Sequence, residues 1–292
     1  MCRAAVLLLA LAAVAACGCG ERADGAGDGS GRLASVKSFA FAIGSGDLRG
    51  DPAAVAARYA PFDLAVVDGE EADRREVRAM QRSGTLVLGY LSVGTIEPYR
   101  SWYPLLRPYR LPTRFEEFGE WYARLNAVGY RQALAGRIAP RLLHKGFDGL
   151  FLDNTDMIET HRRQSPGMRR LVALLSRRVH RGGRVLFTQN GESVIGAMLR
   201  RYDGWNREDV TSTYDFESRS YRRVSRFDHR AALAALRRFA GRGLVTLATD
   251  YIAAGDAPVR RKAVAAACAA GALPFVSNIE LTRIPARPFA CG

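Results

Sequence analysis

A short apolar segment that ends in a carboxylate is the first place in this sequence where chemistry is expected. Residues 147–152 predict a strand buried on both faces, as in a parallel sheet covered by helices. Asp153 follows directly, and Asp156 comes three residues later. A carboxylate in mid-core would be costly to ionise, whereas functional side chains of α/β folds lie at the carboxyl ends of strands. Asp153 is therefore predicted to do chemistry; capping of the next turn is its alternative role.

A second acid, Glu208, completes a candidate catalytic pair. Cleavage of a glycosidic bond needs two carboxyl groups flanking it, about 5 to 9 Å apart. Strands two apart around a barrel point inward in the same layer, so Asp153 and Glu208 can approach within that range. Two alternatives for Glu208 stay open, a solvated loop or an ion pair with Arg207, and Asp209 is the substitute acid.

Further polar side chains follow the other predicted strands and would converge on one mouth. Carboxylates and amides bond sugar hydroxyls in pairs, and aromatic rings stack on the apolar face of a sugar. The sequence therefore predicts a sugar-binding mouth, and for Asp68 and Asp250 the alternative is pairing with a nearby Arg. The residues expected to bind substrate are Asp68, Tyr90, Ser92, Glu97, Asp156, Gln189, Asn190, Asp209, Asp250 and Tyr251, and Asp47, Asn278 and Glu280 also follow strands.

Alternating strand and helix patterns position these side chains. Alternation of this kind implies a parallel sheet, and eight strands in about 260 residues predict an α/β fold, a single (β/α)8 TIM barrel over residues 36–292. The aromatic and Pro-rich segment 95–129 predicts an elaborated loop after the third strand that walls the site. The predicted strands are 37–43, 63–67, 86–92, 147–152, 184–188, 204–210, 244–249 and 273–277. The predicted helices are 53–59, 72–81, 130–144, 168–179, 193–201, 230–240 and 258–270, with Asp51, Asp228 and Asp256 as caps.

The first 35 residues have the pattern of an export signal and a linker. Arg3 and the apolar segment 4–13 predict a signal peptide over residues 1–16, and Val14-Ala15-Ala16-Cys17 resembles the lipobox of bacterial lipoproteins. Cys17 is therefore expected to be lipidated, with an ordinary secretory signal as the alternative. Residues 17–35 predict a flexible tether. We expect an exported protein anchored by lipid in the cell envelope or, on the alternative, one that is secreted or periplasmic.

The charge of the chain and its cysteine content indicate which partners, metals and disulfides to expect. The 292 residues carry a net charge of +14, but Arg is spread over most predicted helices and no nucleic-acid-binding motif is present, so nucleic acid is not an expected partner. The basic surface is instead suited to anionic envelope polymers or lipid head groups. No Cys/His spacing indicates a metal site, no cofactor is expected, and we expect a monomer. Cys268 and Cys291 could pair, but a small-residue helix around Cys268 favours a free, buried thiol.

An ordered set of motifs resembles glycoside hydrolase family 114, which contains the endo-α-1,4-polygalactosaminidases. Its strand motifs are similar to residues 62–68 (FDLAVVD), 88–94 (LGYLSVG) and 146–153 (GFDGLFLD). Its later Gln-Asn and Glu-Asp pairs correspond to Gln189-Asn190 and Glu208-Asp209. The similarity runs in order from about residue 37 to residue 282.

This resemblance implies a TIM barrel that cleaves α-1,4-linked galactosamine polymers. It implies a retaining reaction with Asp153 as the nucleophile and Glu208 as the general acid/base. Thr95 stands where the family has a Glu, which would change substrate preference, and a +14 protein repels a cationic polymer unless a local acidic cleft offsets that charge. The alternative function is a non-catalytic surface lipoprotein that binds an envelope polysaccharide.

Overall fold

The computed structural model describes residues 29–291 except 45, 47 and 49. The signal peptide predicted for residues 1–16, the lipidation site Cys17 and the strand-end Asp47 lie outside the described residues. Within the described part of the chain, no helix is long and apolar enough to span a bilayer.

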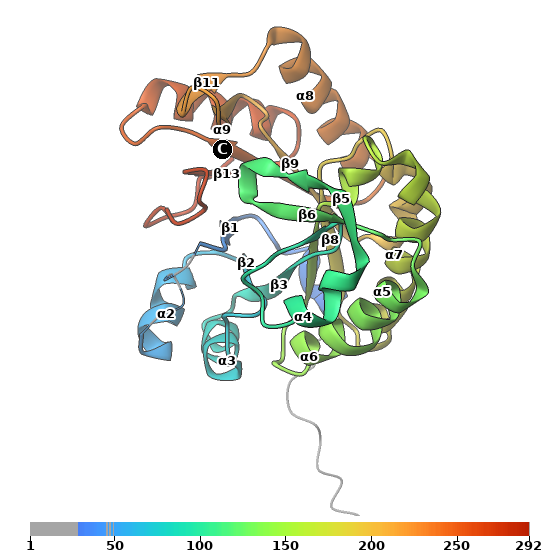
Figure 1. Cartoon of the computed structure of the whole chain (residues 1–292). Helices are drawn as coiled ribbons and strands as arrows, with labels where there is room; N and C mark the ends of the chain where they lie inside the picture. The colour runs from blue at the N-terminus through green and yellow to red at the C-terminus, as the bar shows by residue number, and fades with distance from the viewer. Residues whose placement is uncertain (1–28, 45, 47, 49, 292) are drawn as a thin grey trace, which may run out of the picture.

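Eight parallel strands form the central sheet, and helices surround it (Figure 1). The rings of Phe39 and Phe275, on the first and last strands, lie 5.4 Å apart, so the sheet curves into a nearly closed (β/α)8 TIM barrel. All eight predicted strands and the predicted fold class are confirmed. In sheet order the strands are β1 (Phe39–Ala42), β2 (Leu64–Asp68), β3 (Leu86–Ser92), β7 (Gly149–Asp153), β8 (Val185–Gln189), β9 (Gly204–Glu208), β12 (Val245–Tyr251) and β13 (Leu273–Ser277).

The helices lie close to their predicted positions, with local differences at their ends. They are α2 (Pro52–Tyr59), α3 (Arg74–Arg82), α5 (Val128–Ala133), which continues through a π-helical turn into α6 (Ala139–Leu143), α7 (Ser165–Arg181), α8 (Arg226–Ala240) and α9 (Ala257–Ala269). The segment predicted as a helix at 193–201 is the 3-10 helix Ile195–Arg201. Asp228 does not cap α8; Ser225 does, because its hydroxyl oxygen accepts the Asp228 N–H, and α8 therefore starts earlier than predicted.

Two insertions lie over the carboxyl ends of the strands. The predicted loop after β3 contains β4 (Thr95–Ile96), α4 (Tyr103–Leu106), β5 (Arg110–Phe115) and β6 (Glu120–Ala123), and its strands form an antiparallel sheet with the order β4-β6-β5. A second insertion, which the sequence did not predict, is the hairpin of β10 (Ser212–Asp215) and β11 (Ser220–Arg223). Figure 1 shows the first insertion in green in front of the barrel strands.

Part of the range predicted as a tether is folded against the barrel. Residues Gly29–Leu33 form the short helix α1. Arg32 donates a hydrogen bond to the Gly84 carbonyl oxygen (2.8 Å) and pairs with Asp148 (3.4 Å). Asp148 also accepts the Val87 N–H (2.8 Å), so it joins neighbouring strands at the end opposite to Asp153. Residues before 36 therefore also pack on the barrel.

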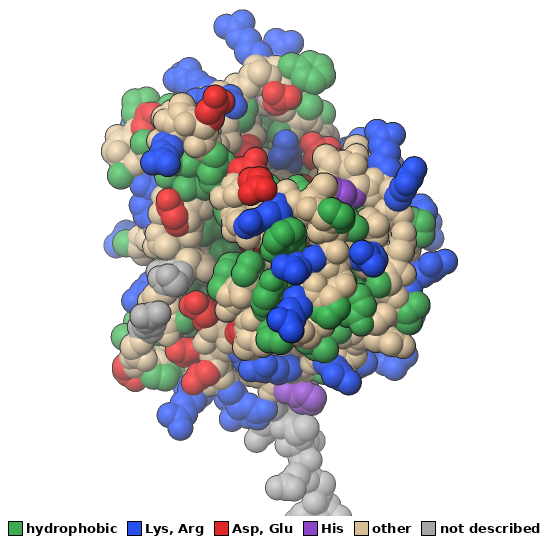
Figure 2. All heavy atoms as spheres, viewed as in Figure 1, with side chains coloured by type: hydrophobic (Ala, Val, Ile, Leu, Met, Phe, Trp, Pro, Cys, Tyr) green, Lys and Arg blue, Asp and Glu red, His purple; other side chains and the backbone are tan. Residues whose placement is uncertain are grey.

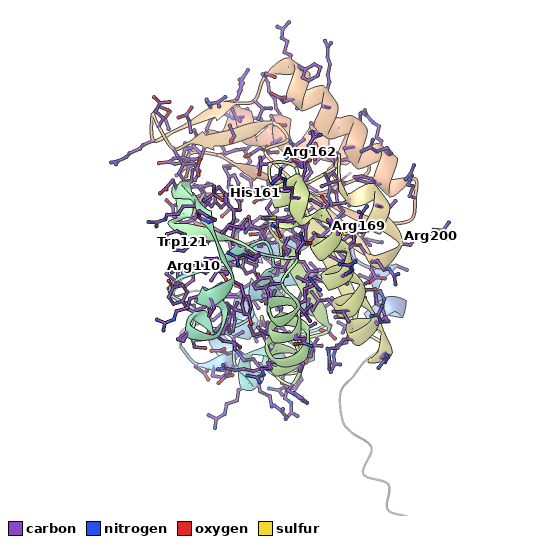
Figure 3. The ribbon with its side chains drawn as sticks, turned by 45° about the vertical axis from the view of Figure 1, so that its right-hand side comes forward. Arg110, Trp121, His161, Arg162, Arg169 and Arg200 are labelled. Atoms are coloured by element: carbon purple, nitrogen blue, oxygen red, sulfur yellow. A yellow bond between two sulfur atoms is a disulfide. The ribbon has the colours of Figure 1, made fainter. Side chains whose placement is uncertain are left out.

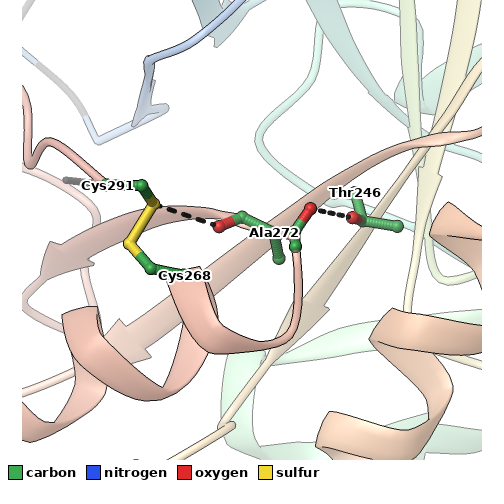
Figure 4. Close-up of a disulfide and its surroundings, with 5 residues drawn as sticks. Thr246, Cys268, Ala272 and Cys291 are labelled. Carbon is green, nitrogen blue, oxygen red and sulfur yellow. Dashed lines mark hydrogen bonds between the residues drawn. A yellow bond between two sulfur atoms is a disulfide. The ribbon is translucent and has the colours of Figure 1, made fainter.

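A disulfide joins Cys268 of α9 to Cys291 near the C-terminus (Figure 4). The preference for a free Cys268 was therefore wrong. The pattern around Cys268 describes its helix correctly but carries no information about the chain after β13. That segment returns to α9, where the two Cα atoms lie 5.3 Å apart, a usual separation for a disulfide.

Candidate active site

Asp153 and Glu208 line one cavity of about 350 Å³ at the carboxyl ends of the barrel strands, here called the mouth cavity. Asp153 ends β7 and Glu208 ends β9, with β8 between them. Gln189 of β8 pairs with Asn206 of β9. Side chains alternate between the two faces of a strand, so Glu208, two residues after Asn206, points to the same face one step nearer the carboxyl end of β9. The barrel thus brings together the two acids that were predicted from the sequence.

Hydrogen-bond donors converge on the Asp153 carboxylate. The Tyr90 hydroxyl donates to Oδ2 (2.5 Å), and the Gln189 side-chain amide donates to Oδ1 (2.5 Å). Asn154 adds its backbone N–H (2.6 Å to Oδ1) and its side-chain amide (3.1 Å to Oδ2). Donors of this kind stabilise the charged form of a carboxyl group. These bonds orient the Asp153 carboxyl group and favour its charged form, so Asp153 is more than the cap of the turn that follows it.

Glu208 accepts hydrogen bonds from two neutral groups. The Asn190 amide donates to Oε2 (2.7 Å), and the Tyr251 hydroxyl donates to Oε1. Arg207 does not pair with the Glu208 carboxylate; its guanidinium lies 3.4 Å from Glu192 and donates to the side-chain carbonyl oxygen of Asn190. The alternative of an ion pair between Arg207 and Glu208 is thus not realised, and Arg207 helps to orient the amide that holds Glu208.

The surroundings of Asp153 and Glu208 favour different protonation states of the two carboxyl groups. Burial raises the pKa of Asp153, and the bonds from Tyr90, Gln189 and Asn154 oppose that rise. Burial, together with the charges of Asp153 and Asp209, raises the pKa of Glu208 to about 8. Two neighbouring buried acids do not both ionise readily at neutral pH. Because Asp153 has more donors, its surroundings favour the charged form, whereas those of Glu208 favour the protonated form.

Three functional strands end in the same backbone turn. Asn154, Asn190 and Asp209 each have positive φ (57°, 52° and 55°), and each directly follows a polar residue that ends its strand. Asn and Asp enter the left-handed region more readily than other non-glycine residues. The pairs Asp153-Asn154, Gln189-Asn190 and Glu208-Asp209 therefore share one geometry, which stops the strand immediately after the side chain that it presents.

The structure places seven of the predicted site residues on the wall of the mouth cavity. Besides the two catalytic candidates, they are Tyr90, Asp156, Gln189, Asn190 and Tyr251. Ser92 lies behind the wall, where its hydroxyl contacts the Thr95 hydroxyl (2.6 Å) and accepts the Asn154 side-chain amide (3.1 Å). Ser92 thus positions Asn154, which in turn bonds to Asp153.

Asp68 and Glu97 lie outside the cavity and hold the first insertion in place. Arg100 donates to Asp68 (2.6 Å) and to Glu97 (2.9 Å), and all three side chains are buried. Asp68 also accepts the N–H groups of Glu70 and Glu71. The alternative role given for Asp68, a partner of a nearby Arg, is therefore the one observed.

Asp209 and Asp250 do not line the cavity either. Alternation along β12 points Tyr251 inward and Asp250 outward. Asp250 accepts the backbone N–H groups of Thr211 (2.6 Å) and Ser212 (2.8 Å) and so fixes the start of the β10–β11 hairpin. Its partners are backbone amides, not the Arg that was the alternative.

Glu120 is the acid that the sequence did not single out. It lies buried on β6, lines the mouth cavity and accepts a hydrogen bond from the Thr95 hydroxyl (2.6 Å). Burial, with the charges of Glu97 and Asp153, raises its pKa to about 8. An acid therefore stands beside Thr95, the position where the family motif has its Glu. In the sequence, nothing separates Glu120 from the exposed Glu116 and Glu117; only the antiparallel pairing of β4 and β6 does so.

The mouth cavity is acidic and partly aromatic. Among the described residues that line it, none is Arg, Lys or His, so it is suited to a neutral or cationic ligand. Within the described residues, no three His, Cys, Asp or Glu side chains are arranged to hold a metal ion. The lining acids are Glu120, Asp153, Asp156, Glu208 and Glu280, and the rings and apolar side chains include Phe41, Ile43, Tyr99, Phe115, Phe118, Ile279 and Leu281.

Structural comparisons agree with this fold. The chain resembles the glycoside hydrolase domain of PelA from Pseudomonas aeruginosa (TM-score 0.72, 23% identity, covering 86% of this chain and 97% of that domain). It also resembles Ega3 from Aspergillus fumigatus, solved as a complex with galactosamine (TM-score 0.66, 16% identity, covering 84% and 92%). These similarities support the TIM-barrel fold.

Sequence comparisons identify the family. A protein of Deinococcus radiodurans described as uncharacterized is 25% identical over 245 residues, which cover 78% of this chain and 77% of that protein. The model of glycoside-hydrolase family GH114 matches residues 28–287, nearly the whole described chain. The predicted resemblance is confirmed: the chain belongs to glycoside-hydrolase family GH114.

Proposed function

We propose that this glycosidase hydrolyses an α-linked, galactosamine-containing polysaccharide with retention of anomeric configuration. The observation that carries the proposal is the placement of Asp153 and Glu208 in one cavity, with donors converging on the first and a raised pKa on the second. Hydrolysis of a glycosidic bond needs one carboxylate and one protonated carboxyl group flanking that bond.

The mechanism follows from these two protonation states. The Asp153 carboxylate attacks the anomeric carbon while Glu208 gives its proton to the departing glycosidic oxygen. The product is a glycosyl ester of Asp153 and a shortened chain. Glu208, now ionised, then takes one proton from a water molecule while the water oxygen bonds to the same carbon. The bond between that carbon and Asp153 breaks, Asp153 leaves as a carboxylate, and Glu208 is again protonated. Tyr90 and Gln189 hold Asp153 for the attack, and Tyr251 and Asn190 orient Glu208.

The acidic lining supports an amino sugar as substrate. Asp156, Glu120 and Glu280 add carboxyl groups to a cavity whose described lining residues include no basic side chain. A protonated amine gains from such a field, whereas a uronic acid would be repelled. The galactosamine bound in the structure of Ega3 is consistent with this choice.

Export and lipid anchoring rest on the sequence of residues 1–17, and the Cys268–Cys291 disulfide favours an oxidising compartment. If Cys17 is lipidated, the wild-type protein partitions with membranes, and Cys17→Ser moves it to the soluble fraction. Radiolabelled fatty acid incorporated at Cys17 is the direct readout. Equal partitioning of both proteins would leave the ordinary secretory signal as the explanation.

Cleavage of a defined polymer tests the proposed reaction. The purified protein is incubated with α-1,4-linked galactosamine polymer, new reducing ends are counted, and NMR records the anomer that forms first. We expect α-product from the wild type and none from Asp153→Asn or Glu208→Gln. Product of inverted configuration would refute retention. Binding without product, unaffected by both substitutions, would instead support the non-catalytic lipoprotein.

A further inference from the structure

A second cavity, here called the outer cavity, adjoins the mouth cavity. Its volume is about 470 Å³, and it lies between the two insertions and the chain after β13. Phe118, Ile279 and Glu280 line both cavities, so the two are consecutive parts of one cleft. The remaining lining residues of the outer cavity are Glu117, Tyr214, Phe216 and Arg219.

Aromatic rings from both insertions form a continuous surface between the cavities. Phe118 of the first insertion and Phe216 of the hairpin meet with centroids 5.3 Å apart. Phe115 lies 5.2 Å from Phe118 on one side, and Tyr214 lies 5.1 Å from Phe216 on the other. Phe118 and Phe216 remain 48% and 38% exposed. Large apolar side chains that contact each other and still face water are typical of a binding surface.

The charged groups of the outer cavity indicate the chemistry of its ligand. Glu117 and Glu280 face it together with Arg219, which leaves a net charge of minus one. Asn278 donates to the Glu280 carboxylate (2.8 Å) and holds it at the boundary between the two cavities. Aromatic rings bind the apolar face of a sugar, while carboxylates bind hydroxyl and ammonium groups.

We infer that the outer cavity is a sugar subsite for an amino-sugar residue beyond the two that the scissile bond joins. This inference rests on the proposed function and extends it from the reacting bond to a longer stretch of polymer. The affinity for an oligomer then grows with its length until the outer cavity is filled.

The ring contribution is tested with α-1,4-linked galactosamine oligomers of two to eight sugars. The ratio of kcat/KM for the longest to that for the shortest cleaved oligomer is measured in the wild type, in Phe216→Ala and in Phe227→Ala. Phe227 is a matched control because it is 81% exposed on α8 and lines neither cavity. We expect Phe216→Ala to lower the ratio about three- to tenfold. An equal loss for short and long oligomers, or a ratio like that of Phe227→Ala, would overturn the subsite.

The contribution of the Glu117 charge to ligand binding is tested with two variants, Glu117→Gln and its control Glu116→Gln. Glu117 lines the outer cavity, whereas the adjacent Glu116 is exposed and lies 3.8 Å from Arg114. We expect Glu117→Gln to lower the preference for a de-N-acetylated hexamer over an N-acetylated one about two- to fivefold. Glu116→Gln keeps the wild-type preference. If the two substitutions act alike, the ligand of the outer cavity is not recognised through its amine.

Binding to a catalytically inactive variant separates this inference from the proposed reaction. Calorimetry in the Glu208→Gln background records oligomer affinity with and without Phe216→Ala. If the wild type cleaves nothing, yet affinity rises with length and depends on Phe216, the subsite stands and the hydrolase proposal fails. If the polymer is cleaved but affinity does not rise with length, the subsite fails alone.

Discussion

The mouth cavity and the outer helical face of this protein carry opposite charge. Five acids line the mouth cavity, and the described residues around it include no basic side chain. On the outer face, the charged side chains along the right-hand edge in Figure 2 are mostly the blue of Lys and Arg, and Figure 3 shows Arg162, Arg169 and Arg200 spread over this side of the molecule. The net charge of +14 therefore describes the outside of the barrel and says little about the site.

This difference shows how a basic protein can accept a cationic polymer. Over distances beyond the Debye length of about 8 Å, salt screens the exposed Arg side chains, whereas charges in a cavity with apolar walls act on a bound ligand with much less screening. Arg110 and Arg114 of the first insertion are held against the Trp121 ring, 4.5 and 4.8 Å from its centroid, and neither lines the mouth cavity. The charge of the cavity, and not the net charge of the chain, should therefore govern which ligand binds.

The largest expected effect comes from removing either catalytic carboxyl group. Asp153→Asn and Glu208→Gln should each lower polymer cleavage about 10³-fold or more. Glu208→Gln should at the same time raise thermal stability at pH 8, because it removes an acid that burial makes costly to ionise. Calorimetric melting and reducing-end assays measure the two effects. A loss of both activity and stability would assign Glu208 to packing.

The rate should depend on pH through Glu208. Its pKa is raised to about 8, so cleavage should fall about tenfold per pH unit above that value, where the general acid loses its proton. Stability changes in the same direction. The folded state holds this proton between about pH 4.5 and 8 while the unfolded chain does not, so the contribution of Glu208 to stability is full below about pH 4.5 and is lost as pH rises through 8. Glu208→Gln should therefore stabilise the fold at pH 8 and not at pH 4. A flat kcat/KM from pH 6 to 10 would contradict the assignment.

The barrel and the location of Asp153 and Glu208 in one cavity could be predicted because they depend on local patterns. Each strand shows as an apolar segment, and a polar residue that ends such a segment must lie at one rim of the barrel. A second local pattern marks the ends of three strands: an Asn or Asp at positive φ directly follows the polar residue that ends the strand. It occurs in the pairs Asp153-Asn154, Gln189-Asn190 and Glu208-Asp209. For these residues, their place at the end of a strand is sufficient to predict that they lie at the rim of the barrel.

The remaining site depends on contacts between distant segments. Asp68 ends β2 as Asp153 ends β7, and Asp250 is the last residue but one of β12. Each of these two acids nevertheless binds a structural partner, the Arg100 guanidinium for Asp68 and two backbone amides for Asp250. Glu120 reaches the cavity only because β6 pairs with β4, and Cys291 meets Cys268 only because the chain returns after β13. No short pattern encodes such pairings, so they require coordinates.

Substitutions of Asp68 and Asp156 should have different effects, because Asp68 binds Arg100 whereas Asp156 lines the mouth cavity. Asp68→Asn leaves Arg100 with one strong buried partner and should lower the free energy of unfolding by about 3 kcal/mol. Asp156 lines the cavity, and burial with nearby charges raises its pKa to about 7, so Asp156→Asn should not destabilise the fold but should raise KM. Denaturant unfolding and steady-state kinetics separate the two. The opposite pattern would return Asp68 to the substrate-binding set.

Glu120→Gln probes the missing family acid. Glu120 has a pKa of about 8 in the free protein, and a bound ammonium group would favour its charged form; the substitution removes that charge while preserving shape and the contact with Thr95. We expect kcat/KM for de-N-acetylated oligomers to fall about tenfold, the effect of losing one charged hydrogen bond, and that for N-acetylated oligomers to fall less. A Thr95→Val control removes the hydroxyl that holds Glu120 and should give a smaller effect in the same direction. Equal losses on both substrates would mean that Glu120 does not recognise an amine.

The smallest effect is expected on the outer face. Replacing Arg162, Arg169 and Arg200 together by Gln removes three positive charges from exposed positions outside the described cavity lining. At 0.15 M salt, screening should keep the change in kcat/KM below about twofold, and the change should grow at 0.01 M salt, where the Debye length is about 30 Å. Since the variant is less repulsive to a cationic polymer, the low-salt change should be an increase. A decrease at either salt concentration would show that the polymer is anionic, and the acidic mouth would then have to be assigned a different ligand.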